Sequence, residues 1–331
     1  MGHDKLRKFA ENETFSCLLQ PSSRELLAEG YFNLKDHPVK GNWSGFLGHD
    51  GPVVLELGCG KGEYTIDLAR RDAGRNYIGV DIKGARLWKG AKYAMENKLG
   101  NVGFLRTRIE FITAFFAPGE VEEIWLTFSD PQLKSPNSRL TSPVFLERYR
   151  KFLKPGGVVH LKTDSRFLHE YTKAVCRVNG LEIVACTADL YGHKSAEGGA
   201  AGGGAVGAVG GAAGGGAVGG GAGGGGVGGG AEGACPFGVG AVGAVGSAAG
   251  GIVPAVRDGN TFEGLSPDSL DPVVREVKTF YEQMSLKQGF DITYLSFRLD
   301  SGKPLRSPED PSEFDSKLWR SLESPRHFFG L

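Results

Sequence analysis

Short apolar runs alternate with amphipathic segments between residues 50 and 190. Each run is followed by glycine or a polar residue, and most lead into a segment in which apolar side chains recur every three or four positions. This alternation predicts parallel strands connected by helices, which is a doubly wound α/β sheet. The expected strands are 53–57, 76–82, 102–106, 123–128, 158–162 and 181–186, and the expected helices are 64–71, 85–98, 109–116, 144–153 and 167–178.

One more helix and one more strand are expected near the C-terminus. Residues 273–288 have a helical pattern, and residues 292–299 are rich in β-branched and aromatic side chains. We place 292–299 as a seventh strand, antiparallel to its neighbours and paired beside the sixth. The predicted strand order is 3-2-1-4-5-7-6, which is a Rossmann-like α/β sheet.

A glycine-rich stretch separates the sixth strand from the late helix. The chain has 53 glycines, and most of them lie between residues 198 and 251 together with alanine and valine. Such a segment cannot bury enough surface to offset the entropy of ordering it, and two doublings of a loop cost only roughly 1.2 kcal/mol of closure entropy. The expected organisation is an N-terminal arm at 1–50, a core at 51–190, a low-complexity insertion at 191–258, the C-terminal part of the core at 259–300 and a disordered tail at 301–331.

Charge and cysteine content restrict the classes of partner. Lys plus Arg and Asp plus Glu each number 38, so a nucleic-acid partner would have to be held by a local basic patch. The five cysteines show no CxxC spacing, which predicts neither a zinc site nor a disulfide framework. Residues 1–15 lack an apolar signal region, and the glycine-rich stretch lacks the large apolar side chains of a membrane span. We therefore expect a cytoplasmic protein with no metal and no membrane partner.

The turn after the first strand is the most specific local pattern. Glycines 58, 60 and 62 occur in Leu-Glu-Leu-Gly-Cys-Gly-Lys-Gly, between the strand and a helix. A dinucleotide fingerprint would place its third glycine at Glu63, whose carboxylate would repel a pyrophosphate. A backbone-lined turn with the nearby carboxylate of Glu56 suits S-adenosyl-L-methionine (AdoMet), which has a cationic sulfonium and no phosphate. A tight turn that binds no ligand is the alternative.

Two further residues at strand ends are candidates for cofactor binding. Asp81 ends the second strand, where a carboxylate can accept both ribose hydroxyls of an adenosine. Arg108 follows the third strand and could stack on an adenine ring. A solvated aspartate in a turn and an exposed arginine are the respective alternatives.

The ends of the fourth and fifth strands are candidates for the substrate side. Asp130 follows the fourth strand, Lys134 on the next loop could contact phosphate, and Asp164 follows the fifth strand. For Asp164 a helix N-cap is an equally good interpretation. A site with carboxylates but no evident histidine or cysteine nucleophile suits methylation of guanine N7, which has an in-plane lone pair and needs no general base.

In order along the chain, these motifs resemble the bacterial tRNA (guanine-N7)-methyltransferases, which are class I AdoMet-dependent methyltransferases. The resemblance covers roughly residues 38–190 and 273–299 and includes Thr279-Phe280-Tyr281-Glu282, which is similar to the family's substrate motif. It implies a seven-stranded class I sheet and transfer of a methyl group from AdoMet to N7 of a guanine in tRNA. It also implies that the cofactor is bound by Glu56, Gly58, Gly60, Gly62, Asp81, the residue at position 108 and Asp130, that Asp130 is catalytic, and that Lys134, Asp164, Thr279, Phe280, Tyr281 and Glu282 bind the tRNA nucleotide.

Some positions depart from the family pattern. The usual Phe-Pro-Asp-Pro-Trp reads Phe-Ser-Asp-Pro-Gln at 128–132, and the basic run after Lys134 is reduced to Arg139. Both departures concern tRNA binding more than the cofactor. We expect tRNA as the partner and a monomer or weak homodimer. The alternatives are an AdoMet-dependent methyltransferase of a small molecule or protein, and a non-catalytic AdoMet- or RNA-binding module.

Overall fold

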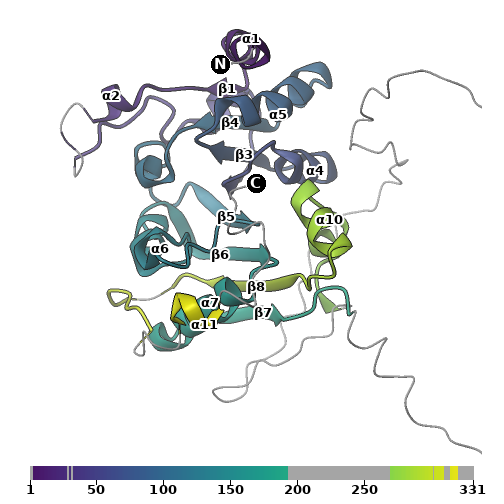
Figure 1. Ribbon diagram of the computed structural model, residues 1–331. Helices are drawn as coiled ribbons and strands as arrows, with labels where there is room; N and C mark the ends of the chain where they lie inside the picture. The colour runs from purple at the N-terminus through teal and green to yellow at the C-terminus, as the bar shows by residue number, and fades with distance from the viewer. Residues whose placement is uncertain are drawn as a thin grey trace, which may run out of the picture. The chain divides into compact units, whose positions relative to one another are not determined.

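The computed structural model describes residues 3–27, 30, 33–192, 269–300, 302–308 and 314–319 (Figure 1). The predicted low-complexity insertion, apart from its first two residues, lies outside these ranges. Among the described residues, no helix combines the length and the apolar character needed to cross a membrane.

The described core is a single mixed sheet of eight strands in the order β1-β4-β3-β2-β5-β6-β8-β7 (Figure 1). All neighbouring strands are parallel except β8, which is antiparallel to both β6 and β7. The predicted order 3-2-1-4-5-7-6 corresponds to β4-β3-β2-β5-β6-β8-β7 and is confirmed. The strands are β1 Leu18–Leu19, β2 Val53–Leu57, β3 Asn76–Asp81, β4 Val102–Arg106, β5 Val121–Thr127, β6 Leu153–Thr163, β7 Ile183–Thr187 and β8 Thr293–Arg298.

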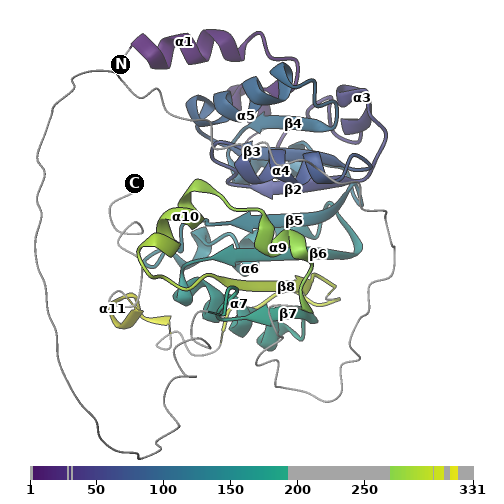
Figure 2. The same cartoon turned by 90° about the vertical axis from the view of Figure 1, so that its right-hand side faces the viewer.

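Helices cover both faces of this sheet. The helices α4, α9 and α10 lie on one side of the sheet, and α6 lies on the other (Figures 1 and 2). The helices are α1 His3–Asn12, α2 Ser23–Leu26, α3 Trp43–Leu47, α4 Glu63–Arg71, α5 Gly84–Glu96, α6 Pro143–Tyr149, α7 Arg166–Asn179, α9 Pro272–Glu276, α10 Phe280–Lys287 and α11 Ser316–Trp319, with 3-10 turns η1 Ile109–Ala114 and η2 Pro136–Ser138.

The described residues of segment 1–50 contact the core through side chains and helix packing. The Trp43 side chain is buried, stacks on Phe116 and donates its indole N–H to the carbonyl of Phe115 at 2.9 Å. Helix α1 contacts α5, where Trp88 donates to Glu11 at 2.7 Å. These elements are only two to ten residues long. Segments this short give little periodicity for a sequence pattern to detect.

The described parts of residues 301–331 also contact the core. Phe314 is buried and meets the rings of Phe167 and Tyr171 on α7 edge to face. The backbone N–H of Leu305 donates to Glu147 at 2.8 Å. Aromatic burial is favourable enough to hold a segment that is otherwise rich in proline, serine and charge.

Several element boundaries differ from the sequence prediction, and the main differences lie around Tyr149 and within residues 273–288. Helix 144–153 ends early at Tyr149, and strand β6 starts at Leu153, before the Pro-Gly-Gly that we expected to break the chain. The single helix predicted over 273–288 is two helices, α9 and α10. Between them Val277 is extended, and the Thr279 hydroxyl caps α10 by accepting from the N–H of Glu282 at 3.1 Å. A threonine cap starts a new helix because its side chain replaces the missing backbone acceptor.

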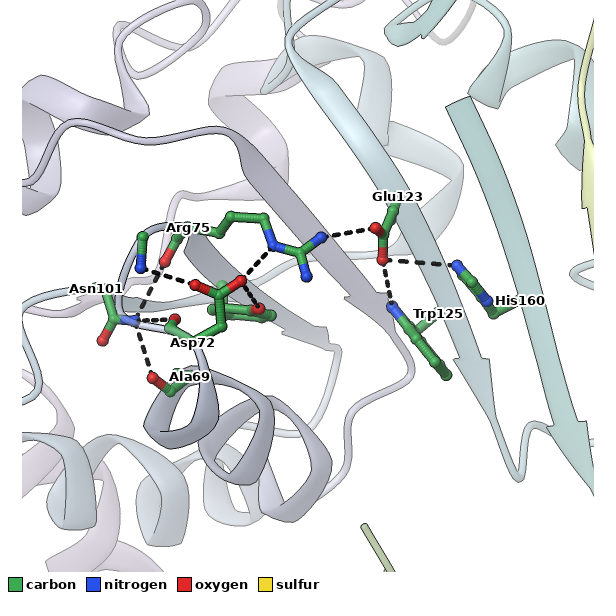
Figure 3. Close-up of polar contacts among 9 residues, drawn as sticks. Ala69, Asp72, Arg75, Asn101, Glu123, Trp125 and His160 are labelled. Carbon is green, nitrogen blue, oxygen red and sulfur yellow. Dashed lines mark hydrogen bonds and ion pairs between the residues drawn. The ribbon is translucent and has the colours of Figure 1, made fainter. Parts of the chain in front are cut away.

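A partly buried polar network ties the C-terminal end of α4 to the middle of the sheet (Figure 3). Asn101 donates to three carbonyls around this end, and Asp72 pairs with Arg75 at 2.7 Å. Arg75 continues to Glu123 on β5 at 2.6 Å, and Glu123 lies 3.6 Å from His160 on β6. Burial opposes ionisation of Glu123, but His160 and Arg75 outweigh it and lower the pKa of Glu123 to about 2.

Candidate active site

The glycine turn between β2 and α4 has the conformation that its sequence requires. Gly58, Gly60 and Gly62 have φ angles of 78°, 58° and 73°, in the left-handed region that favours glycine. At Gly62 a Cβ atom would also lie 2.5 Å from the ring of Phe104, whereas Gly58 and Gly60 face open space. The turn is held by the carbonyl of Val80, which accepts from the N–H groups of Gly58 and Cys59. The backbone of the turn is therefore both rigid and accessible.

Asp81 connects this turn to the start of α5. Its carboxylate accepts from the N–H of Gly60 at 3.1 Å and from the N–H of Lys83 at 2.7 Å. The side chain is only 7% exposed, and burial raises the pKa of Asp81 above its ordinary value, although the N–H of Lys83 partly offsets this effect. The predicted acceptor thus lies at the predicted strand end, beside the turn.

Glu56 lies behind the turn. One carboxylate oxygen accepts from the N–H of Thr65 at 2.9 Å and from the Thr65 hydroxyl, and the other accepts from the Thr127 hydroxyl at 2.5 Å. Burial raises the pKa of Glu56 to about 7, against the opposing effect of these hydroxyl donors. Glu56 therefore joins β2, α4 and β5 beneath the glycine turn.

A cleft of about 460 Å³ opens above the carboxyl ends of β2, β3 and β5. Ligands bind at this edge in open α/β sheets, and about 300–1,000 Å³ is the usual size of a small-molecule site. Of the predicted site residues, the cleft is lined by Gly58, Gly60, Asp81, Asp130, Thr279, Phe280 and Tyr281, whereas Glu56, Gly62, Arg108, Lys134, Asp164 and Glu282 are outside its lining.

The loop after β5 brings Asp130 into the cleft. The backbone is in the left-handed region at Phe128 and again at Gln132, with φ angles of 51° and 48°. Non-glycine residues rarely adopt this conformation, and it often marks a functional site. Asp130 is exposed and accepts from the N–H of Gln132 at 2.9 Å. Its neighbour Ser129, which lines the cleft, was missed because a serine here is visible in the sequence only as a departure from the family motif.

Helix α10 closes the other side of the cleft and contacts the glycine turn. The N–H of Phe280 donates to the Glu63 carboxylate at 2.8 Å, and the Lys61 ammonium lies 4.7 Å from the centre of the Phe280 ring. Phe280 is half exposed. The part of the chain after the insertion is thus attached directly to residues adjacent to the glycines that were predicted to bind the cofactor.

Two predicted tRNA contacts are buried beneath α10. Asp164 is 4% exposed and accepts from the hydroxyl of Ser285 at 2.5 Å. The cap of α7 is Ser165, whose hydroxyl accepts from the N–H of Leu168 at 3.0 Å, so the interpretation of Asp164 as a helix cap is wrong. Glu282 is fully buried and lies 2.8 Å from the ammonium of Lys162.

Arg108 and Lys134 lie away from these groups. Arg108 precedes η1 and pairs with Glu110 at 3.0 Å, and its guanidinium is 5.8 Å from the centre of the Phe111 ring. Lys134 is exposed on the loop after β5. Their predicted contacts with adenine and with tRNA remain predictions.

Comparison with known proteins decides the family. A family model described as "Putative methyltransferase" matches residues 50–190. The tRNA (guanine-N(7)-)-methyltransferase of Christiangramia forsetii is 52% identical over 191 residues, which are 57% of this chain and 83% of that protein. The protein of the same name from Bacteroides thetaiotaomicron is 51% identical over 194 residues, which are 58% of this chain and 74% of that protein. The chain belongs to the tRNA (guanine-N7)-methyltransferase family.

Family membership confirms the resemblance drawn from the motifs, and the cleft of this family member fits AdoMet. The open backbone at Gly58 and Gly60 leaves room for a ligand against the turn, because a Cβ atom at either position would meet nothing within 4 Å. The Asp81 carboxylate lines the same cleft, and a carboxylate can accept hydrogen bonds from hydroxyl groups. Glu63 stands at the start of α4, where its carboxylate would repel a pyrophosphate placed against the helix N-terminus.

Proposed function

We propose that the protein transfers a methyl group from AdoMet to N7 of a guanine in tRNA. The observation that carries this proposal is the common cleft, in which the glycine turn and Asp81 face Asp130 and the start of α10. The relatives that are about half identical to the chain support the same substrate by their names.

In this proposal each half of the cleft has its own ligand. Gly58 and Gly60 contact AdoMet through their backbone, and Asp81 accepts its ribose hydroxyls. Glu56 and Gly62 act from below by fixing the turn. Asp130, Thr279 and Tyr281 face the guanine.

The chemistry suits a site that has acceptors but no base. When bound, AdoMet supplies an electrophilic methyl group on a sulfonium. Guanine N7 carries a lone pair and no proton, so the protein has to align the two groups at about 3–3.5 Å and stabilise the positive charge that develops on the base. The exposed carboxylate of Asp130 places negative charge in the cleft, where it stabilises a cationic base.

Basic side chains around the cleft supply a local surface for phosphate. Lys61, Lys83 and Arg86 line the cleft, and Lys134 is exposed on the adjoining loop. Contacts from lysine and arginine to phosphate position an RNA without reading its sequence. A patch of this size supports tRNA binding in a chain with no net charge.

The test is methylation of two matched tRNA transcripts with labelled AdoMet. One transcript contains guanosine, and the other contains 7-deazaguanosine, in which a C–H group replaces N7. We expect 7-methylguanosine in nucleoside digests of the first transcript and no incorporation into the second. Equal incorporation into both transcripts, or incorporation only into a metabolite or protein fraction, would refute the proposal.

A further inference from the structure

The substrate motif at the start of α10 has two sides. Thr279, Phe280 and Tyr281 line the cleft, whereas Glu282 is fully buried. In a capping box of the form Thr-x-x-Glu, the glutamate reaches back to the N–H of the cap residue. Here the Glu282 carboxylate instead contacts two side chains from other parts of the fold, Lys162 and Tyr191.

Lys162 holds the chain on both sides of Thr279. Its ammonium lies 2.8 Å from the carboxylate of Glu282 and donates to the carbonyl of Val277 at 2.8 Å. The ring of Tyr64 lies 5.5 Å from the same ammonium. Lys162 is itself fully buried at the end of β6, and a buried ammonium is tolerated only with such partners. The hydrogen bond from Lys162 explains the break between α9 and α10, where the Val277 carbonyl turns toward the ammonium.

Tyr191 adds a second donor to the same carboxylate oxygen. Its hydroxyl donates to Oε1 of Glu282, the oxygen that also faces Lys162, and lies 3.2 Å from the carbonyl of Arg275. Its ring lies 4.5 Å from the ammonium of Lys278. Three segments of the chain meet at this carboxylate, namely β6, the loop after β7 and α10.

The second oxygen of Glu282 has a different environment. Oε2 is buried and has no hydrogen-bond partner among the described residues. A buried acceptor without a donor costs free energy. Among the described residues, the carboxylate is therefore held through Oε1, by Lys162 and Tyr191.

We propose that Lys162 and Tyr191 are positioning residues for methyl transfer, which act by holding Glu282 so that Thr279 and Tyr281 at the start of α10 are oriented for the acceptor base. This inference rests on the proposed function. Lys162 also binds the Val277 carbonyl, so the chain is held on both sides of Thr279, which lines the cleft.

The main test compares Tyr191→Phe with a matched control, Tyr294→Phe. Each variant removes one partly or fully buried hydroxyl, and the Tyr294 hydroxyl contacts His160 at 2.8 Å instead of Glu282. The readouts are kcat and KM for tRNA, the AdoMet dissociation constant from calorimetry, and the melting temperature. We expect Tyr191→Phe to lower kcat/KM for tRNA about tenfold, with AdoMet affinity within twofold of the wild type and a melting temperature close to that of Tyr294→Phe.

Two results would overturn this inference. One is a kcat/KM for Tyr191→Phe equal to that of Tyr294→Phe. The other is a loss of activity in Tyr191→Phe that is matched by a loss of AdoMet affinity or by a markedly lower melting temperature than the control, since the hydroxyl would then serve cofactor binding or folding and not the position of α10.

Lys162→Met provides a second measurement. If the variant folds, we expect its kcat/KM for tRNA to fall at least a hundredfold while AdoMet still binds, and wild-type activity would refute a role for Lys162. If it does not fold, Tyr191→Phe decides the question. Failure of the proposed function is distinguishable, because in that case the wild type itself forms no 7-methylguanosine.

Discussion

Glu56→Gln should make the stability of the protein less dependent on pH. In the wild type, Oε2 of Glu56 accepts from the N–H and the hydroxyl of Thr65, and Oε1 accepts from the hydroxyl of Thr127. A glutamine fits this environment, because its carbonyl can take the position of Oε2 and its amide can donate to the Thr127 oxygen once that hydroxyl rotates. The substitution therefore removes a buried charge and keeps the hydrogen bonds.

The magnitude follows from the pKa of Glu56, which burial raises from the ordinary 4.5 to about 7. Between these two values the folded protein retains a proton that the unfolded chain has lost, so the free energy of unfolding falls as the pH rises through this window. A shift of one pKa unit corresponds to about 1.36 kcal/mol, so the full loss is about 3 kcal/mol, and it is complete above pH 7.

Urea denaturation of wild type and Glu56→Gln between pH 4.5 and 8 measures this effect. Other groups titrate in the same range, so the informative quantity is the difference in free energy of unfolding between the two proteins at each pH. We expect the difference to be small at pH 4.5 and to reach about 3 kcal/mol in favour of glutamine at pH 8. Parallel curves over the whole range would show that the buried carboxylate does not carry a raised pKa.

Three further predictions concern ligands and the insertion. Asp81→Ala should weaken AdoMet binding roughly tenfold to a hundredfold by calorimetry, because it removes an acceptor at the glycine turn, and unchanged affinity would contradict the cofactor assignment. Asp130→Ala should abolish most single-turnover methylation while AdoMet affinity stays within a few-fold, and near-normal turnover would place the acceptor elsewhere. Replacing residues 198–251 with a short turn should preserve folding and tRNA methylation, since Tyr191 already contacts Arg275 across the insertion. A variant that folds and binds AdoMet but no longer methylates tRNA would contradict this expectation.

The central sheet was predictable because its strands carry a strong local signal. The run Val53–Leu57 is buried at every position and ends in a glycine turn, and the strand at 102–106 has the predicted bounds. A fully buried parallel strand reads as a continuous apolar run, and helices cover both faces of such a sheet. The glycines were equally readable, since three positive φ angles leave few other residues possible.

Elements whose conformation depends on distant partners were not predictable. The strand Leu18–Leu19 has only two residues and exists because it pairs with β4. The break between α9 and α10 depends on Lys162, which lies more than a hundred positions earlier in the chain. A local pattern contains no information about such a contact, so the helical periodicity of 273–288 was read as one continuous helix.

The burial of charged site residues was not predictable for the same reason, because it depends on distant partners. A motif identifies Asp164 and Glu282 by spacing, and spacing alone makes both look like surface groups that reach a ligand. In the fold Asp164 meets Ser285 and Glu282 meets Lys162, and each contact joins β6 to α10. Residues that a family motif associates with substrate can thus act indirectly, by holding the helix that faces the substrate.

Glu63 affects both the class of ligand that the turn can bind and the attachment of α10. Its carboxylate stands where a dinucleotide-binding turn would have its third glycine, at the start of α4, and there it would repel a pyrophosphate. That carboxylate accepts from the N–H of Phe280, and its other oxygen lies 3.6 Å from the ammonium of Lys89. Glu63, whose carboxylate would repel a phosphate ligand, is therefore also the residue to which the start of α10 is attached. Because α10 follows the insertion, this contact brings the late segment of the chain to the glycine turn. The two halves of the cleft therefore depend on each other.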